Sequence, residues 1–393
     1  MSEQETLIAE ILTRSVDNIV DRAHLEARLK AGEKLRVKLG IDPTSPNLHI
    51  GRAIPLLKLR KFQDLGHQII FLIGDFTAVI GDTSDKDAER PMLSREIVTE
   101  NMQAYLRQAE KILNINLVEV VYNSHWLGGL LYNEIGEQAD VFSLNDFIAR
   151  SNIKARLDKG TRVSLREVLY PIMQGYDSVA VRADVELGGA DQWFNLLAGR
   201  KLQKHYDQEP QDILTTVLIE GLDGRKMSSS WGNTINLLDE PKDMFGKVMS
   251  LRDDLIGKYF EHCTTLPVAE VKKYQQQLEQ GEINPRDLKE ILALEITKLY
   301  HGEEGAKEGQ QYFQTVFRDK GLPEEIPEVK VTSANILDVL VETGLVESKS
   351  EARRVIDQGG VRMNDEVVKS VDVEVTPEAI IQKGKRQVVK VLL

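Results

Sequence analysis

The first half of the chain alternates short apolar runs with stretches in which apolar residues recur every three or four positions. Residues 35–41 (LRVKLGI) and 68–74 (QIIFLIG) are short, apolar and bounded by turn residues, a pattern typical of buried strands. Between them, residues 51–65 carry apolar side chains at helical spacing. A strand, a helix and a second strand in this order predict a βαβ unit with parallel strands.

The same alternation continues further along the chain. Helical patterns precede strand-like runs twice more, with helices expected at 92–113 and 191–205 and strands at 117–122 and 213–219. We therefore expect residues 1–235 to form an α/β domain with a doubly wound, Rossmann-like parallel sheet. Residues 100–165 are expected to be a largely helical insertion in it.

The second half of the chain has a different pattern. Residues 236–320 are helical and polar, and residues 321–333 hold two prolines and several acids without any period, which indicates a linker. Residues 334–393 predict a small α+β module. In it, Ser348 and Glu351 have the spacing of a capping box, a Gly-Gly pair ends the helix, and Asn364–Asp365 marks a tight hairpin.

Composition narrows the class of protein. Of 393 residues, 41% are hydrophobic and 28% are charged, as in soluble globular proteins, and no apolar run reaches the length of a membrane span. The acidic, helical start does not resemble a targeting segment. The single cysteine, Cys263, excludes an internal disulfide and a cysteine-built zinc site. We expect a cytoplasmic enzyme without membrane association.

Charge gives a weaker indication about partners. The formal net charge of −12 disfavours a protein that coats nucleic acid. Residues 334–393, however, hold nine lysines and arginines against ten aspartates and glutamates, so most of the negative charge lies elsewhere. A local basic face in this module would be compatible with RNA binding.

The turn after the first predicted strand is the first candidate site. Asp42 and Thr44 follow the predicted strand, and His49 and Gly51 lie at the start of the predicted helix. Ligands of open parallel sheets bind beyond the carboxyl ends of the strands, and the N–H groups of a helix start suit phosphate. A simple helix cap with a surface histidine would explain the same residues. On its own the turn is weak evidence.

A second loop strengthens the prediction of a phosphate site at the first turn. Residues 221–230 read GLDGRKMSSS, with Lys226 beside Met227 and three serines. A lysine among hydroxyl groups is suited to holding the terminal phosphates of a nucleotide, although a solvated loop would look similar. Each loop is expected at a strand-to-helix corner. Together they predict a nucleotide site.

These motifs carry a resemblance to a known family. HIGR with KMSSS resembles the paired signatures of class I aminoacyl-tRNA synthetases. The stretches DPTSPNLHIG, IGDTSDKDAER and YPIMQGYDS with LGGADQWFN are similar to bacterial tyrosyl-tRNA synthetases, over the whole chain. The resemblance implies a tyrosine–tRNA ligase, an enzyme that uses ATP with Mg²⁺ and acts on L-tyrosine and tRNA(Tyr). No tightly bound cofactor and no metal held by the protein itself are implied.

The resemblance also implies roles at the phosphates. Tyrosine would attack the α-phosphate of ATP without a covalent enzyme intermediate, so donors and cations matter more than a nucleophile. Thr44, His49 and Lys226 would stabilise the transition state. Lys86 and Arg90 match a loop that closes on pyrophosphate, although four nearby acids would also suit a solvated loop. The implied ATP-binding residues are Asp42, His49, Gly51, Arg52, Lys226, Met227, Ser228 and Ser229.

The resemblance implies an amino-acid pocket at the helix around YPIMQGYD. Tyr170, Gln174 and Asp177 are four and three residues apart, so one helical face carries them. The resemblance implies that Asp177 accepts a hydrogen bond from the substrate phenol. The other residues implied at tyrosine are Lys38, Asp82, Tyr170, Gln174 and Gln192.

Three positions depart from the common family pattern. Lys38 stands where many members have a tyrosine that touches the phenol, and Ser229 stands where the second lysine of KMSKS is usual. Arg52 replaces a histidine or asparagine near the ribose. A longer and permanently charged side chain at position 52 would reach toward phosphate and offset the missing lysine.

The C-terminal module is the expected RNA contact. Its helix buries Ala352, Val355 and Ile356 in the expected register and leaves a basic edge exposed, which would contact the RNA backbone or be an ordinary solvated face. The RNA-binding residues implied are Lys349, Arg353, Arg354 and Arg362. By resemblance, residues 236–320 would face the anticodon side, and the 100–165 insertion would supply the surface of a homodimer.

Two other functions remain open at the level of sequence. A tryptophanyl-tRNA synthetase would share the fold and both signatures, but Asp177 together with DPT and GGADQ favours tyrosine. A non-catalytic RNA-binding paralogue would have an eroded active site. Thr44, His49, Asp82 and Lys226 are all present, and this favours an enzyme.

Overall fold

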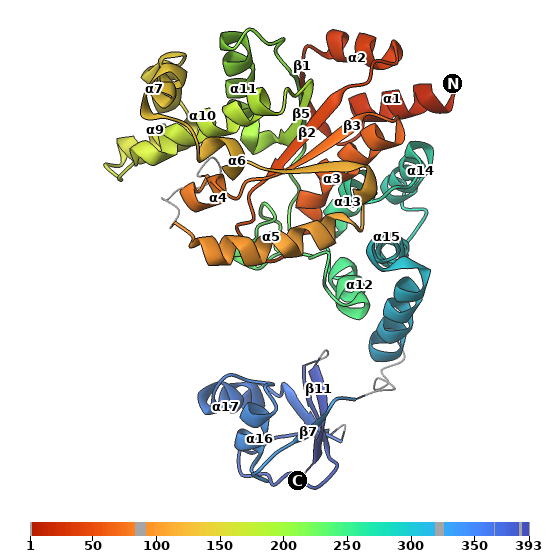
Figure 1. Ribbon diagram of the computed structural model, residues 1–393. Helices are drawn as coiled ribbons and strands as arrows, with labels where there is room; N and C mark the ends of the chain where they lie inside the picture. The colour runs from red at the N-terminus through yellow and green to blue at the C-terminus, as the bar shows by residue number, and fades with distance from the viewer. Residues whose placement is uncertain (1, 83–91, 319–325, 365, 385–386, 393) are drawn as a thin grey trace. The chain divides into compact units, whose positions relative to one another are not determined.

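The computed structural model describes residues 2–82, 92–318, 326–364, 366–384 and 387–392. Contacts along the chain divide it into two compact units, Met1–Ala306 and Lys307–Leu393. Each unit has its own sheet, one of which is shown in red to green and the other in blue in Figure 1. Among the described helices, none is both long enough and apolar enough to cross a membrane.

A six-stranded sheet forms the centre of the first unit. Its strand order is β1-β6-β5-β2-β3-β4, and every neighbouring pair is parallel except β1 with β6. Order reverses between β2 and β5, so the predicted doubly wound fold is confirmed. The strands are β1 (Val16–Val20), β2 (Arg36–Ile41), β3 (Gln68–Ile73), β4 (Val118–Tyr122), β5 (Val185–Gly189) and β6 (Asp212–Thr216).

Helices cover both faces of this sheet. From β2, Lys38 reaches α10 (Leu165–Ala180), where its Nζ lies 2.8 Å from Ser178 Oγ. Because successive strand residues point to opposite faces, Val37 and Leu39 face the other side, where α3 (Ile50–Asp64) packs. Helix α10 also packs along α11 (Trp193–His205), and the pair is visible side by side in Figure 1.

The expected insertion starts later than residue 100. Helix α5 (Arg95–Ala109) leads into β4, and β4 pairs with β3 as a full member of the sheet. The helical excursion from the sheet therefore runs between β4 and β5. It begins with four short helices, α6 (Ser124–Leu127), α7 (Tyr132–Asp140), α8 (Leu144–Ile148) and α9 (Ser151–Asp158), and then α10 returns to the sheet.

The remaining helices lie before, between or after the strands of this sheet. Helix α1 (Glu3–Thr13) precedes β1, α2 (Arg22–Lys30) lies between β1 and β2, and the short α4 (Thr77–Ile80) follows β3. After β6 the chain is helical, as expected, with α12 (Pro241–Met249), α13 (Ile256–Cys263), α14 (Val268–Glu279) and α15 (Pro285–Phe313). Helix α15 is interrupted at Gly302, where φ is +73°, and a π-helical turn, Gln314–Arg318, follows it. Single 3₁₀ turns lie at Ile115–Leu117, Ala190–Gln192, Ser229–Trp231 and Asp253–Leu255.

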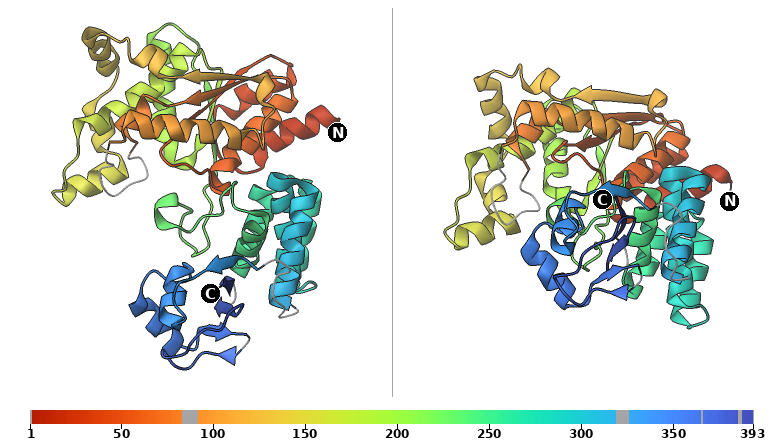
Figure 2. Two further views of the ribbon diagram at one scale, coloured as in Figure 1. Left: turned by 60° about the horizontal axis from the view of Figure 1, so that its bottom comes forward. Right: turned by 90° about the horizontal axis from the view of Figure 1, so that it is seen from below.

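The second unit is an α+β fold built on a five-stranded sheet of order β7-β11-β10-β8-β9. Helices α16 (Ile336–Glu342) and α17 (Lys349–Asp357) bury their apolar faces in its core, and Figure 2 shows them on the same side of the sheet. The strands are β7 (Glu328–Lys330), β8 (Val361–Met363), β9 (Glu366–Val367), β10 (Ile380–Lys383) and β11 (Gln387–Leu392).

Two local predictions in this unit are met and one is corrected. Ser348 Oγ accepts the Glu351 amide at the start of α17, and Asn364 turns β8 into β9 with a φ of +48°. Asp365 lies outside the described residues. The expected linker, 321–333, is wrong for 328–330, which form β7 parallel to β11. That pairing joins residues far apart in sequence, so the local run of prolines and acids could not reveal it.

Candidate active site

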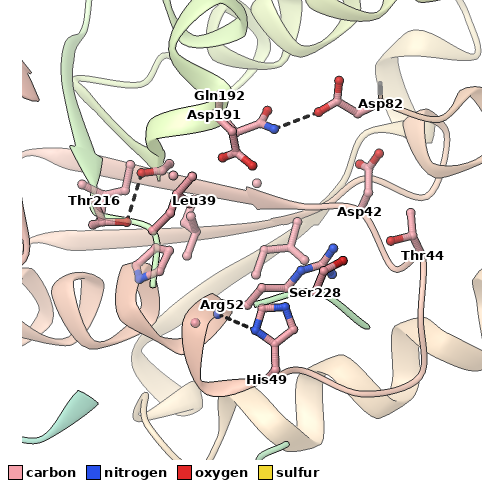
Figure 3. Close-up of a pocket in the computed structure, with 18 of the residues that line it drawn as sticks. Leu39, Asp42, Thr44, His49, Arg52, Asp82, Asp191, Gln192, Thr216 and Ser228 are labelled. Atoms are coloured by element: carbon pink, nitrogen blue, oxygen red, sulfur yellow. Dashed lines mark hydrogen bonds between the residues drawn. The ribbon is translucent and has the colours of Figure 1, made fainter. Parts of the chain in front are cut away.

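One cavity of about 550 Å³ opens at the carboxyl ends of the central strands. It is lined by residues 38–41 of β2 and the adjoining Asp42, by residues 187–189 of β5 and by Thr216 of β6, together with α10 and the start of α3. Figure 3 shows Asp42, Thr44, His49, Asp82 and Gln192 around this pocket, although they come from separate parts of the chain. This is the position at which open parallel sheets bind their ligands.

The residues predicted at ATP and at tyrosine gather in this cavity wherever the structure describes them. Lys86 and Arg90 lie outside the described residues. The predicted residues that line the cavity are Lys38, Asp42, Thr44, His49, Gly51, Arg52, Asp82, Tyr170, Gln174, Asp177, Gln192, Lys226, Met227, Ser228 and Ser229. Their individual roles stay predictions, and their common location supports one site.

His49 lies directly before α3, at the end of the turn that is predicted to bind phosphate. It has extended backbone angles, and its Nδ1 accepts the Arg52 amide at 3.3 Å, so the imidazole is the N-cap. Burial, reinforced by the charges of Arg52 and Lys226, lowers the His49 pKa to about 3. The ring is therefore neutral near pH 7. Because Nδ1 is an acceptor here, the ring proton sits on Nε2, which is a donor suited to a phosphate oxygen.

The KMSSS segment does not sit at a strand-to-helix corner, as expected, but in an extended loop. After β6, Met227 N donates to Ile219 O at 2.9 Å, and the next α-helix starts only at Pro241. Asn233 stabilises the loop because its Oδ1 accepts the Ser228 amide and its Nδ2 donates to Lys226 O. The segment pairs with residues around Ile219, earlier in the same loop, and therefore does not start a helix.

Lys226 projects from this loop into the cavity. Its Nζ lies 2.8 Å from Asp191 Oδ2, and both side chains are partly exposed. An ion pair in contact with solvent contributes little stability, so Lys226 can exchange this partner for a phosphate at low cost. The pairing keeps the ammonium within the cavity before a nucleotide arrives.

The opposite end of the cavity is built around Asp177. The carboxylate is 2% exposed, and it accepts Trp126 Nε1 at 2.8 Å on Oδ1 and Asn123 Nδ2 at 3.2 Å on Oδ2. Burial raises its pKa to about 7, while Lys38 and the two N–H donors oppose that rise. A buried acceptor with lone pairs remaining is suited to a ligand hydroxyl.

Lys38 is part of a buried polar cluster next to Asp177. It forms an ion pair of 2.8 Å with Glu186 of β5, and these side chains are 0% and 1% exposed. Glu186 also accepts from Ser178 Oγ and from Gln211 Nε2. A buried pair needs such additional partners to offset desolvation. The lysine that departs from the usual family tyrosine is therefore fixed by Glu186, in the wall of the pocket.

Acceptor groups gather along the middle of the cavity. Tyr170 Oη donates to Asp42 Oδ2 at 2.8 Å, and Thr77 Oγ1 donates to Asp42 Oδ1 at 2.8 Å. Burial and the charge of Asp42 raise the Tyr170 pKa well above its usual value, so the phenol stays neutral. Gln192 Nε2 donates to Asp82 Oδ2 at 2.8 Å. These carboxylates are suited to a cationic ammonium group.

Several side chains of this site were missed at the level of sequence. Asn123 follows the carboxyl end of β4, and this position could have identified it. Glu186 was missed as well, although it and the predicted Lys38 are opposite charges inside two apolar strands, which is a signal for a buried pair. Trp126 and Asp191 carried no such signal, since their partners are distant in sequence.

The four residues of the predicted basic edge in the second unit are exposed, but one of them forms an ion pair with an acid of the same unit. Arg353, Arg354 and Arg362 are exposed, and α17 buries Ala352 and Ile356, as expected. Lys349 is exposed but forms an ion pair with Asp338.

Comparisons with known proteins show which families this chain is similar to. A family model described as tRNA synthetases class I (W and Y) matches residues 30–318, and one described as Tyrosine--tRNA ligase SYY-like C-terminal domain matches residues 319–390. The Tyrosine--tRNA ligase of Thermotoga maritima is 45% identical over 96% of this chain and 95% of its own length. That of Carboxydothermus hydrogenoformans is 43% identical over 98% and 97%, respectively.

Solved structures show the same fold. The C-terminally truncated mitochondrial tyrosyl-tRNA synthetase of Aspergillus nidulans has a TM-score of 0.66 at 21% identity, covering 80% of this chain and 94% of its own. The tyrosyl-tRNA synthetase of Archaeoglobus fulgidus, complexed with L-tyrosine, has a TM-score of 0.63 at 21% identity, covering 78% and 100%. At such identities the likeness concerns the fold.

Proposed function

Because the chain belongs to the class I tRNA synthetases of the tryptophan and tyrosine group, we propose that it is a tyrosine–tRNA ligase. It activates L-tyrosine with ATP, releases pyrophosphate, and transfers the tyrosyl group to the 3′ end of tRNA(Tyr). The observation that carries this proposal is a single cavity with a buried acceptor, Asp177, at one end and phosphate-binding groups, His49 and Lys226, at the other. A molecule with a phenol and a reacting carboxylate would span the distance between them.

The geometry supports a reaction by positioning and charge. Asp177 accepts the phenol, while Asp82, Tyr170 and Gln174 hold the ammonium group. The carboxylate then faces the α-phosphate, and the neutral His49 donates to the phosphate oxygens on which charge develops. Lys226 moves from Asp191 to the leaving pyrophosphate. Such preorganised donors lower a barrier without a covalent intermediate.

Magnesium enters with ATP in this proposal. The groups at the phosphate end, Thr44, His49, Arg52 and Lys226, are donors and cations, whereas Mg²⁺ takes oxygen ligands. The described residues also contain no cluster of three histidines, cysteines or acids suited to a metal. This donor set fits a magnesium ion that is held through the nucleotide's own phosphates, where it neutralises their charge.

The remaining assignments concern tRNA and assembly. Residues 334–393 bind tRNA through Arg353, Arg354 and Arg362, and residues 236–320 face the anticodon side. Exposed apolar side chains between β4 and α10, Leu131, Tyr132 and Leu144 among them, form the surface of a homodimer. A tRNA-charging enzyme works where translation takes place, so the location is the cytoplasm.

The test is pyrophosphate exchange into ATP with tyrosine, tryptophan and phenylalanine supplied separately. We expect exchange with tyrosine only. Exchange with tryptophan alone would instead identify a tryptophan enzyme, and no exchange with any amino acid would favour a non-catalytic RNA-binding protein. Removal of residues 334–393 should abolish efficient tRNA charging and leave exchange intact; unchanged charging would refute the role of this unit.

A further inference from the structure

The phosphate-binding turn is held in place by one face of α5. Asn101 and Gln108, both buried, bond to the backbone of this turn. Asn101 Nδ2 donates to Pro43 O at 3.0 Å. Gln108 donates through Nε2 to Pro46 O at 3.0 Å and accepts the Leu48 amide on Oε1 at 2.7 Å. A turn without regular structure thus has its backbone groups satisfied by a neighbouring helix.

Tyr105 lies between these two residues on the same face of α5. It is 0% exposed, and its Oη is 2.8 Å from Arg52 Nη1 and 3.3 Å from Ser45 Oγ. Ser45 Oγ in turn donates to Asn47 O at 3.2 Å. A guanidinium only donates and the serine hydrogen is used, so the Tyr105 hydroxyl accepts from Arg52 and donates to Ser45. The result is a directed chain of hydrogen bonds from Arg52 into the turn.

This chain determines where the Arg52 guanidinium lies. Arginine has a long, flexible side chain, and a hydrogen bond to a charged group is stronger than one between neutral groups. Arg52 and Ser45 both line the cavity next to His49. The Arg52 side chain is therefore attached to a buried hydroxyl of another helix, a partner that the sequence did not indicate. A guanidinium also has several N–H groups, so the bond to Tyr105 is compatible with a second bond to phosphate.

We propose that Tyr105 is a positioning residue, which acts on ATP through Arg52 by holding its guanidinium at the phosphate end of the cavity. The proposal rests on the proposed function, because it assumes that ATP phosphates occupy this end. In this proposal Arg52, which departs from the common family pattern, has Tyr105 of α5 as its partner. Preorganisation of a charged donor reduces the entropy lost when the ligand is bound.

The test is Tyr105→Phe, which removes the hydroxyl and keeps the ring. A hydrogen bond to a charged group predicts a rise of about tenfold in the dissociation constant for ATP, measured by calorimetry without tyrosine. The kcat/KM for ATP in pyrophosphate exchange should fall by the same factor, while the KM for tyrosine stays unchanged. A loss of stability alone would not separate the two substrates in this way.

A double-mutant cycle distinguishes action through Arg52 from a general effect on the turn. In an Arg52→Ala background, Tyr105→Phe should leave the ATP dissociation constant unchanged, since the guanidinium is absent. The same loss in both backgrounds would overturn the proposal, and so would unaltered ATP binding in the single variant. Arg52→His also removes the guanidinium, so it should slow adenylate formation; an unchanged or faster rate would count against a role for Arg52.

A matched control and an independent readout complete the design. Tyr300 is also buried, and its Oη has no hydrogen-bond partner within the described part of the chain, so Tyr300→Phe should leave ATP binding and exchange unchanged. If the wild-type chain bound ATP but exchanged no pyrophosphate with tyrosine, the proposed function would fail. The positioning role of Tyr105 would still be measured by calorimetry.

Discussion

The two ends of the cavity are built in different ways. At the tyrosine end, regular elements carry buried polar groups that already have protein partners, such as Asp177 with Trp126 and Asn123. At the phosphate end, loops carry donors, and Lys226 has an ion-pair partner that is easily exchanged. In the proposed function, the end around Asp177 selects its ligand through desolvation, whereas the end around Lys226 supplies charge to the reaction. Substitutions at the two ends should therefore affect different kinetic parameters.

The largest effect is expected for Asp177→Asn. The amide NH₂ would face the N–H group of Trp126 or Asn123, and the phenol would lose its acceptor. We expect kcat/KM for tyrosine to fall by on the order of 10³-fold, because sites built for a hydroxyl depend strongly on it. Discrimination against phenylalanine should be lost in the same assay, with the KM for ATP unchanged.

Asp75→Asn is the matched control for this substitution. Asp75 follows β3 near the pocket and accepts the Ser124 amide, but it does not line the cavity. It should retain tyrosine selectivity. If Asp177→Asn also kept its preference for tyrosine over phenylalanine, selection at this end would have to come from another group.

Lys226→Met tests the phosphate end. We expect kcat to fall by about 10²–10³-fold, since removal of one donor to a developing charge typically costs this much. The KM for tyrosine should not change, in contrast to the Asp177 variant. Lys258→Met, which removes an exposed lysine paired with Glu220, is the control and should be active. Equal losses for the two lysine variants would argue against a specific role for Lys226.

The pH dependence of tyrosine binding should distinguish the two ends further. The Asp177 pKa is raised to about 7, so below that pH a proton occupies one of the oxygens that accept hydrogen bonds. The KM for tyrosine should then rise up to about tenfold per pH unit below 7 and level off above it. His49, with its pKa lowered to about 3, should contribute nothing in this range. A flat profile in the wild type would contradict this assignment.

The same carboxyl group has the opposite effect on folding. Its usual pKa is about 4, so between about pH 4 and 7 the folded chain binds the proton more strongly than the unfolded chain. This contribution therefore stabilises the ligand-free protein as pH falls through 7, while tyrosine binding weakens. In Asp177→Asn both trends should disappear, and thermal melts and the KM for tyrosine, each measured at several pH values beside the wild type, would show this.

The smallest effect is expected for Gly175→Ala in α10. A Cβ atom there would lie 2.9 Å from the Ala198 carbonyl carbon and 3.0 Å from Leu202 Cδ1 in α11. Overpacking of this kind costs about 1–3 kcal/mol, so calorimetry should show a Tm lower by several degrees. Because Gln174 precedes this position, the KM for tyrosine should rise modestly, with that for ATP unchanged.

Gly136→Ala in α7 is the control, since a Cβ atom there would meet no atom within 4 Å. It should be neutral or slightly stabilising in a helix. A lower Tm for this control than for Gly175→Ala would show that the contact between α10 and α11 is not the cause.

The pattern of apolar residues along the chain predicted the positions of strands well where the strands are apolar on both faces. Strands β2 and β3 with α3 between them lie within a residue or two of their expected positions, because local spacing alone determines which face is buried. The linker and the insertion boundary were predicted less well. Strands β4 and β7 belong to sheets through pairing with distant strands, and composition in a local window does not contain that information.

The fold class, the two signature loops and the single helical face that carries Tyr170, Gln174 and Asp177 could be predicted from the order of the residues, because each depends on residues close together in the chain. The partners of the charged and polar groups became known only from the folded chain. Lys38 lies beside Glu186, Asp177 beside Trp126, and Arg52 beside Tyr105. Burial makes Lys38, Asp177 and Tyr105 require a partner, but which partner each finds depends on the packing of distant elements.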